Sequence, residues 1–171
     1  MTASKGFLVE GAKSYFDALG AIEAYERAVC NVCKSVYDKH KQQLVNKIGL
    51  IDAPCEDHEN KQSEDGFVEV GVCQDSESGR NTLYMYLRWD ATKDVVPEIT
   101  AEVCLEFSKK GDRNDYAKLL RKIPSIQLSD ESDYPLLWSS QKLSNLSLCA
   151  EALDELLREL LACWPAGRRL E

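Results

Sequence analysis

Strict alternation between apolar and polar residues in two stretches constrains the fold of this chain most strongly. In residues 83–89 the apolar side chains share one face of a strand, namely Leu83, Met85, Leu87 and Trp89. Residues 99–107 repeat the pattern with Ile99, Ala101, Val103, Leu105 and Phe107. A period of two is typical of a β-strand with one buried face and one face turned to solvent or to a partner. The two stretches therefore predict two strands of a sheet that is covered on one side.

The N-terminal part of the chain has the pattern of a long helix. Residues 7–48 contain no proline, and their apolar residues recur every three or four positions in a single stripe. One helix of about 40 residues would be about 60 Å long, which exceeds the width of a domain of this size. Either Gly20 divides it into two packed helices, or part of it projects and pairs with another copy of the chain as a homodimer.

The remaining segments complete one domain over residues 1–169. We expect a polar loop at 52–65, a strand meander over 66–107, and a C-terminal part over 112–163 with two helices separated by a short strand. The order α-β-β-β-α-β-α predicts an α+β fold of two layers, with a long N-terminal helix and two further helices on an antiparallel sheet of three to four strands. Residues 170–171 have the character of a cloning scar and are set aside.

The charge of the chain favours some partners over others. The 171 residues carry a net charge of −8, whereas nucleic-acid binding depends on Lys and Arg that neutralise phosphates. We therefore expect a basic protein partner and no nucleic acid. No apolar run reaches the roughly 18 residues that cross a bilayer, so we expect no membrane partner. The start of the chain lacks a secretory pattern, and its seven scattered cysteines are typical of free thiols in a reducing compartment, which together predict a cytoplasmic protein.

Two pairs of residues have the spacing of metal ligands. Cys30 and Cys33 form the first pair, and Cys55 and His58 form the second further along the chain. Such pairs can build a tetrahedral zinc site. Cys30 and Cys33 also fall within the predicted long helix, where thiols commonly fill a core. We expect no bound cofactor and keep zinc at these four residues as an alternative.

The polar face of the predicted sheet carries the candidate binding residues, which are Tyr84, Tyr86, Arg88, Glu102 and Glu106. Tyrosine and arginine are favoured at protein interfaces because they bury a large area at a small entropic cost. The glutamates give this face the charge that suits a basic partner. Two alternatives remain open: the charged residues form a cross-strand ladder on a solvated face, or a helix of the same chain covers the tyrosines.

The same face offers one catalytic alternative. Asp90, Glu102 and Glu106 are carboxylates that can hold magnesium. The order of elements resembles the core of the PD-(D/E)XK nucleases, in which an Asp and a Glu-x-Lys motif bind the metal, but Ser108 stands where that family requires lysine. No phosphate-binding loop or nucleophile elbow occurs. The sequence therefore favours a non-catalytic interaction protein, an adaptor or an inhibitor of the immunity type, with a metal-dependent hydrolase or nuclease as the alternative.

Overall fold

A six-stranded antiparallel sheet with helices on one side forms the body of the protein. The computed structural model describes residues 3–60, 66–90, 99–120, 126–128, 136–143 and 148–170. The strands are β1 (Glu56–Asn60), β2 (Phe67–Asp75), β3 (Asn81–Asp90), β4 (Ile99–Phe107), β5 (Ile126–Leu128) and β6 (Leu136–Leu143). Their order across the sheet is β1-β2-β3-β4-β6-β5. The helices are α1 (Ala3–Gln43), α2 (Lys110–Leu119) and α3 (Cys149–Cys163), and a short π-helix, η1 (Leu44–Ile48), follows α1 directly.

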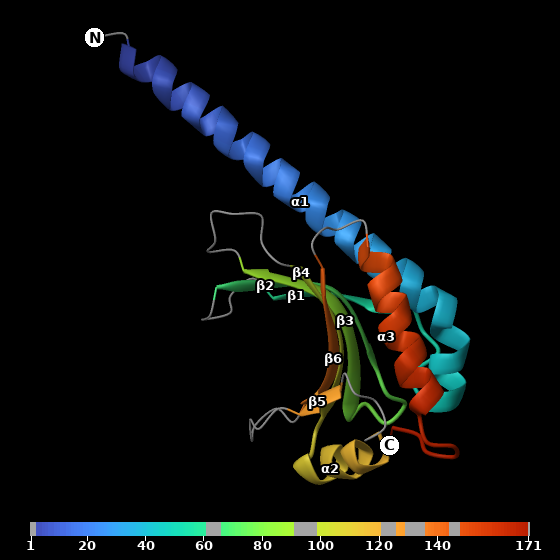
Figure 1. Cartoon of the computed structure of the whole chain (residues 1–171). Coiled ribbons are helices and arrows are strands. Elements are labelled where there is room, and N and C mark those ends of the chain that lie inside the picture. Colours follow the sequence, from blue (N-terminus) through green and yellow to red (C-terminus); the bar gives the residue numbers. More distant parts are fainter. Residues whose placement is uncertain are drawn as a thin grey trace.

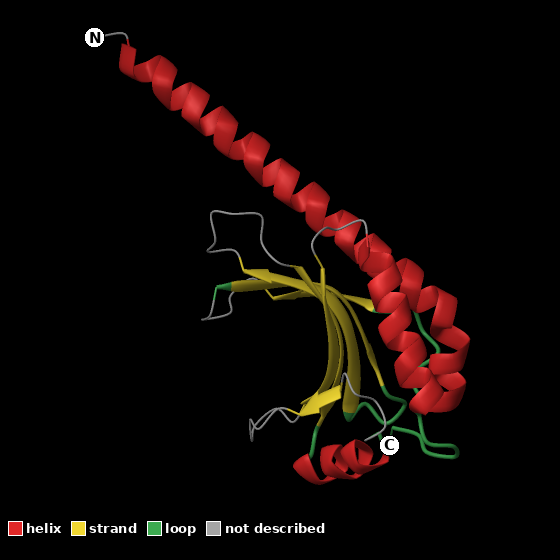
Figure 2. Ribbon diagram, in the orientation of Figure 1, coloured by secondary structure: helices red, strands yellow, loops and turns green. Residues whose placement is uncertain are grey.

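The second half of α1 and the whole of α3 lie side by side on one face of the sheet, and the sheet curves away from them (Figure 2). The alternating apolar residues of β3 and β4 point to these helices, and Leu83, Met85, Leu87 and Leu105 are each 1% exposed. They meet Cys33 and Tyr37 of α1 and the leucines of α3 in a single core cluster. The predicted α+β fold of two layers, with its antiparallel sheet and long first helix, is confirmed.

The sheet has more strands than the three to four that the sequence indicated. The predicted fourth strand is present as β6, and the two additional strands are β1 and β5. β1 lies inside the stretch 52–65, which was expected to be a loop. Its sequence, Glu-Asp-His-Glu-Asn, consists of residues that are mostly depleted in strands, and its position at the edge of the sheet explains how so polar a strand is tolerated.

Helix α1 is unbroken, so Gly20 does not divide it. Its first half extends away from the sheet, as Figure 1 shows, and further along the helix the ring of Tyr25 meets Trp89 edge-on with centroids 5.6 Å apart. An added methyl group at Gly20 would meet nothing within 4 Å. Of the two arrangements expected for this segment, the structure has the projecting one.

The residues after α3 fold back and pack against the body of the protein. Leu170, which we set aside above as part of a cloning scar, is 1% exposed in the core, and its N–H donates to the carbonyl of Ile48 over 2.7 Å. The guanidinium of Arg169 bonds to the carboxylate of Glu77 at 2.8 Å. Residue 170 therefore belongs to the fold. No helix in the described part of the chain is long and apolar enough to cross a membrane.

Candidate functional site

The face of the sheet opposite to α1 and α3 carries all five predicted binding residues. Residues directly opposite in an antiparallel pair share a face, and the register of β3 with β4 places Tyr86 opposite Glu102 and Tyr84 opposite Cys104. β2 and β1 extend the same face, because Glu69 lies opposite Arg88 and His58 lies opposite Gly71. We call this surface the tyrosine face, defined by His58, Glu69, Tyr84, Tyr86, Arg88, Glu102, Cys104 and Glu106.

Gly71 makes room for the rings at the centre of the tyrosine face. It lies between His58 of β1 and Tyr86 of β3 in the register. A Cβ atom at this position would lie 2.7 Å from Cβ of Tyr86 and would also clash with the carbonyl oxygen of Met85. In the space that glycine leaves, the imidazole of His58 packs against both tyrosines, 5.0 Å from the ring of Tyr84 and 5.4 Å from that of Tyr86.

A buried hydrogen bond links the two central strands. The hydroxyl of Tyr86 donates to Oε2 of Glu102 over 2.8 Å and lies 3.3 Å from Sγ of Cys104. Burial raises the pKa of Glu102, although the bond from Tyr86 opposes that rise. Burial, together with the charges of Cys104 and Glu102, raises the pKa of Tyr86 far above its ordinary value. Tyr86 therefore stays a neutral phenol and acts as a fixed hydrogen-bond donor, not as a base or nucleophile.

Glu69 is the centre of a second group of polar contacts on the tyrosine face. One carboxylate oxygen lies 3.7 Å from Nε2 of His58 and accepts a hydrogen bond of 3.3 Å from Asn60, and the other lies 3.7 Å from Nε of Arg88. These partners, His58 first, lower the pKa of Glu69. The guanidinium of Arg88 also lies 4.2 Å from the centre of the Phe67 ring, a cation–π contact. Arg88 is thus held within the protein and offsets part of the charge of Glu69.

The electrostatic character of this face is acidic. By the strand register, the described residues of β1–β4 place six carboxylates on it against the single guanidinium of Arg88; the acids are Glu56, Glu69, Asp75, Asp90, Glu102 and Glu106. Glu56 and Asp75 are exposed at its margin, while Tyr84 and Glu106 are partly buried. The face therefore combines a buried, hydrogen-bonded centre with a negatively charged periphery.

The structure spreads the proposed catalytic carboxylates along the sheet. Asp90 pairs with Phe67 at one end of β3, whereas Glu106 pairs with Thr82 at the other. At about 3.4 Å per residue the two ends are roughly 27 Å apart. Glu102 lies between them, bonded to Tyr86. No single magnesium ion can bind all three.

The structure separates His58 from the three cysteines of the zinc alternative, since Cys30 and Cys33 belong to the core cluster and Cys55 packs against it. Cys30 faces the core, where its thiol donates to the carbonyl of Gly71 over 3.4 Å, and Cys33 is fully buried. His58 points to the tyrosine face on the opposite side of the sheet. Over the ranges that the structure describes, no group of three or more His, Cys, Asp or Glu residues is arranged to hold a metal ion.

Sequence reasoning missed His58 and Gly71 as parts of the binding face. The alternating valines of residues 68–72 are the signal that orients β2 and places Gly71 on the tyrosine face. No comparable signal exists for His58, because β1 has no apolar alternation. Its position follows only from the pairing of β1 with β2.

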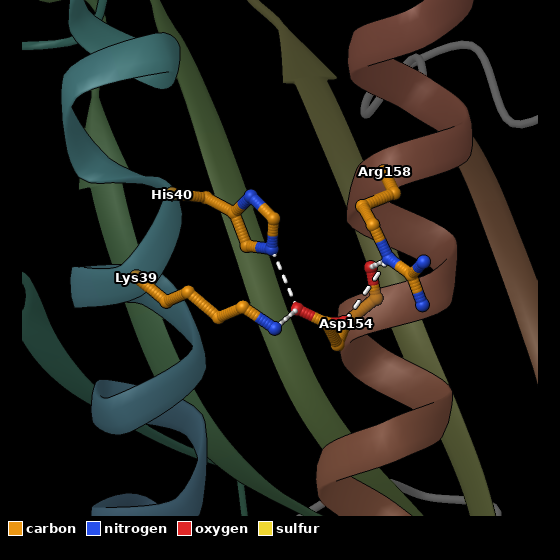
Figure 3. Close-up of polar contacts among 4 residues, drawn as sticks. All are labelled: Lys39, His40, Asp154 and Arg158. Carbon is orange, nitrogen blue, oxygen red and sulfur yellow. Dashed lines mark hydrogen bonds and ion pairs between the residues drawn. The ribbon is translucent and has the colours of Figure 1, made fainter.

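A second polar cluster fixes α1 to α3 (Figure 3). Nζ of Lys39 and Nε2 of His40 each lie 2.7 Å from Oδ1 of Asp154, and Nε of Arg158 lies 3.0 Å from Oδ2. Because a carboxylate only accepts, Nε2 of His40 is the donor. The bonds from Lys39 and His40 lower the pKa of Asp154 to about 2. This cluster is an anchor between α1 and α3.

Comparison of the chain with protein-family models, with curated proteins and with solved structures finds no match.

Proposed function

We propose that this chain is a non-catalytic, cytoplasmic interaction protein, an adaptor or an inhibitor, whose tyrosine face binds a basic segment of another protein. The observation that carries the proposal is the excess of six carboxylates over one guanidinium on that face, within the described strands β1–β4. A lysine or arginine of the partner can pair with a carboxylate while its stem packs on the ring of Tyr84.

Several features support this choice of partner. The acidic face repels nucleic-acid phosphates, because their binding requires clustered cations. Tyr86 and Glu102 are buried and hydrogen-bonded to each other, which holds both side chains in one orientation. Such preorganisation lowers the entropic cost of binding. The thiols of Cys30, Cys33, Cys104 and Cys149 are free and buried, which suits a reducing compartment. A second copy of the chain is a further candidate partner, through the exposed part of α1.

The hydrolase alternative gains no support from the geometry. Its three carboxylates occupy both ends and the middle of the sheet, whereas a shared cation requires oxygen atoms within about 2.0–2.6 Å of one point.

Fluorescence anisotropy with labelled peptides tests the proposal. The probes are a peptide of alternating arginine and serine, and a second in which glutamate replaces each arginine. The arginine peptide is expected to bind, with an affinity that falls as salt rises. Glu106→Gln should weaken binding several-fold, whereas Glu155→Gln, the same change at an exposed site on α3, should not. Equal binding of both peptides, or equal affinity of the two variants, contradicts the proposal.

A further inference from the structure

His58 is the residue of the tyrosine face best placed to change its charge near neutral pH. Histidine is the side chain whose ordinary charge change lies between about pH 5 and pH 8. His58 belongs to β1 at the edge of the sheet, and its side chain keeps 20% of its surface exposed. Its ring packs on Tyr84 and Tyr86, and Nε2 lies 3.7 Å from Oε2 of Glu69. The imidazole therefore reaches both solvent and the centre of the proposed binding surface.

The other titratable and charged groups around His58 come from β1–β4, because α1 and α3 lie on the opposite side of the sheet (Figure 2). By the strand register they are Glu56, Glu69, Cys73, Tyr84, Tyr86, Arg88, Glu102 and Cys104. Burial raises the pKa of the two tyrosines and of the two thiols, so these four groups stay neutral. The bond with His58 is the main cause that lowers the pKa of Glu69, which stays ionised.

The remaining neighbours leave one competitor for His58. A guanidinium is always charged in proteins, and an exposed carboxylate such as that of Glu56 is ionised above about pH 5. Glu102 differs, because burial raises its pKa and it gains a proton more readily as the pH falls. A test of His58 therefore has to separate its protonation from that of Glu102.

The position of the imidazole couples its charge to the bound partner. In the proposed mode of binding, a lysine or arginine of the partner packs on the ring of Tyr84, whose centre lies 5.0 Å from that of His58. A neutral imidazole leaves that cation undisturbed. A protonated imidazole places a second positive charge beside it, and like charges brought together at an interface weaken binding. The added proton also strengthens the pairing of His58 with Glu69, which engages one carboxylate of the face within the protein.

We propose that His58 makes binding at the tyrosine face depend on pH: the neutral ring allows a basic segment to bind, and the protonated ring favours its release. The inference rests on the proposed function and adds the regulation of that same site. Coupling of this kind is reciprocal, so the bound partner must also make His58 harder to protonate. The proposal therefore has two separate readouts, one on the partner and one on the histidine.

Fluorescence anisotropy with the labelled arginine–serine peptide gives the first readout, because arginine keeps its charge at every pH used. The dissociation constant should rise about threefold from pH 7.5 to pH 5.5. His58→Gln keeps a polar side chain but cannot take up a proton, and should remove most of that rise. Glu102→Gln should retain it. His40→Gln should also retain it, because the second histidine of the chain bonds to Asp154 between α1 and α3. Circular dichroism at both pH values confirms that each variant is folded.

Proton NMR of the imidazole signals gives the second readout. The signals of His58 are those that disappear in His58→Gln, and the signals of His40 serve as an internal control. The pH at which half of the His58 rings are protonated should fall by about half a unit when the peptide is bound, which is the shift that corresponds to a threefold change in affinity.

The outcomes separate this inference from the proposed function. Equal affinity at the two pH values, or half-protonation of His58 at the same pH in the free and bound protein, overturns the pH dependence and leaves the basic partner in place. A pH dependence that survives in His58→Gln but disappears in Glu102→Gln overturns the role of His58 and assigns it to Glu102. If the peptide does not bind at pH 7.5, the proposed function and this inference fail together.

Discussion

Tyr86 of β3 donates its hydroxyl hydrogen to the carboxylate of Glu102 on β4 over 2.8 Å, and each residue keeps 8% of its surface exposed. The bond ties the two central strands together on the face that we propose binds a partner. It also keeps a buried acid in a fixed orientation. Its energetic role and its role in binding can be separated by changing one residue at a time.

Removing the donor should destabilise the fold. Tyr86→Phe deletes the hydroxyl and leaves the buried carboxylate of Glu102 without that bond, which costs about 1–3 kcal/mol. Urea denaturation followed by tryptophan fluorescence measures the loss. Thr82→Val, on the same strand at a partly exposed position, should cost less. Equal losses at the two positions would mean that the buried bond has no special role.

Removing the acid should have the opposite effect at neutral pH. Burial holds the pKa of Glu102 above its ordinary value of 4.5, so the folded state retains its proton more strongly than the unfolded state. Ionisation of Glu102 therefore lowers stability as pH rises above about 4.5. Glu102→Gln avoids this cost, keeps a side-chain oxygen that can accept the bond from Tyr86, and should be more stable than the wild type at pH 7. Denaturation curves at pH 7 and pH 4 should show the advantage disappearing in acid; an advantage that persists at pH 4 contradicts the assignment.

The anchor between α1 and α3 predicts the reverse dependence on pH. The pKa of Asp154 falls from 3.8 to about 2 on folding, so its stabilisation is fully present above about pH 4 and is lost as pH falls toward 2. Asp154→Asn should lower stability at pH 7 by about 1–2 kcal/mol, a modest figure because the side chains of Lys39 and Arg158 are largely exposed. Asp38→Asn, at an exposed site on α1, is the control. Thermal unfolding between pH 2 and pH 7 should show the two variants converging in acid.

Replacing Gly20 with alanine and replacing Gly71 with alanine should have opposite effects on the folded protein. Gly71→Ala forces a methyl group against Tyr86 and the Met85 carbonyl, and such overpacking costs about 1–3 kcal/mol. Gly20→Ala meets open space and should increase helicity, since alanine is the better helix former. Chemical denaturation and circular dichroism measure the two effects. A tolerated Gly71→Ala would show that β2 and β3 are not in close contact there.

The alternation of β3 and β4 predicted the sheet and its covered side because each residue's face follows directly from its position. The same rule placed Tyr84, Tyr86, Arg88, Glu102 and Glu106 together. It did not find β1, because an edge strand is held by backbone hydrogen bonds and needs no apolar face. It also grouped Asp90 with Glu106, because the alternation rule assigns a residue to a face of the sheet but does not say how far apart two residues on that face lie. The zinc alternative placed His58 with Cys30 for the same reason: spacing along the chain carries no information about which side of a sheet a residue faces.

The bond between His40 and Asp154 joins residues 114 positions apart, and it bears on how the chain folds. α1 cannot bury the side that faces α3 until α3 has packed beside it, so that side stays uncovered until the C-terminal part of the chain has folded. Contacts this distant in sequence require the closure of a large loop, and chains rich in them fold slowly. We therefore expect folding in milliseconds to seconds, with the apolar side of α1 uncovered for much of that time.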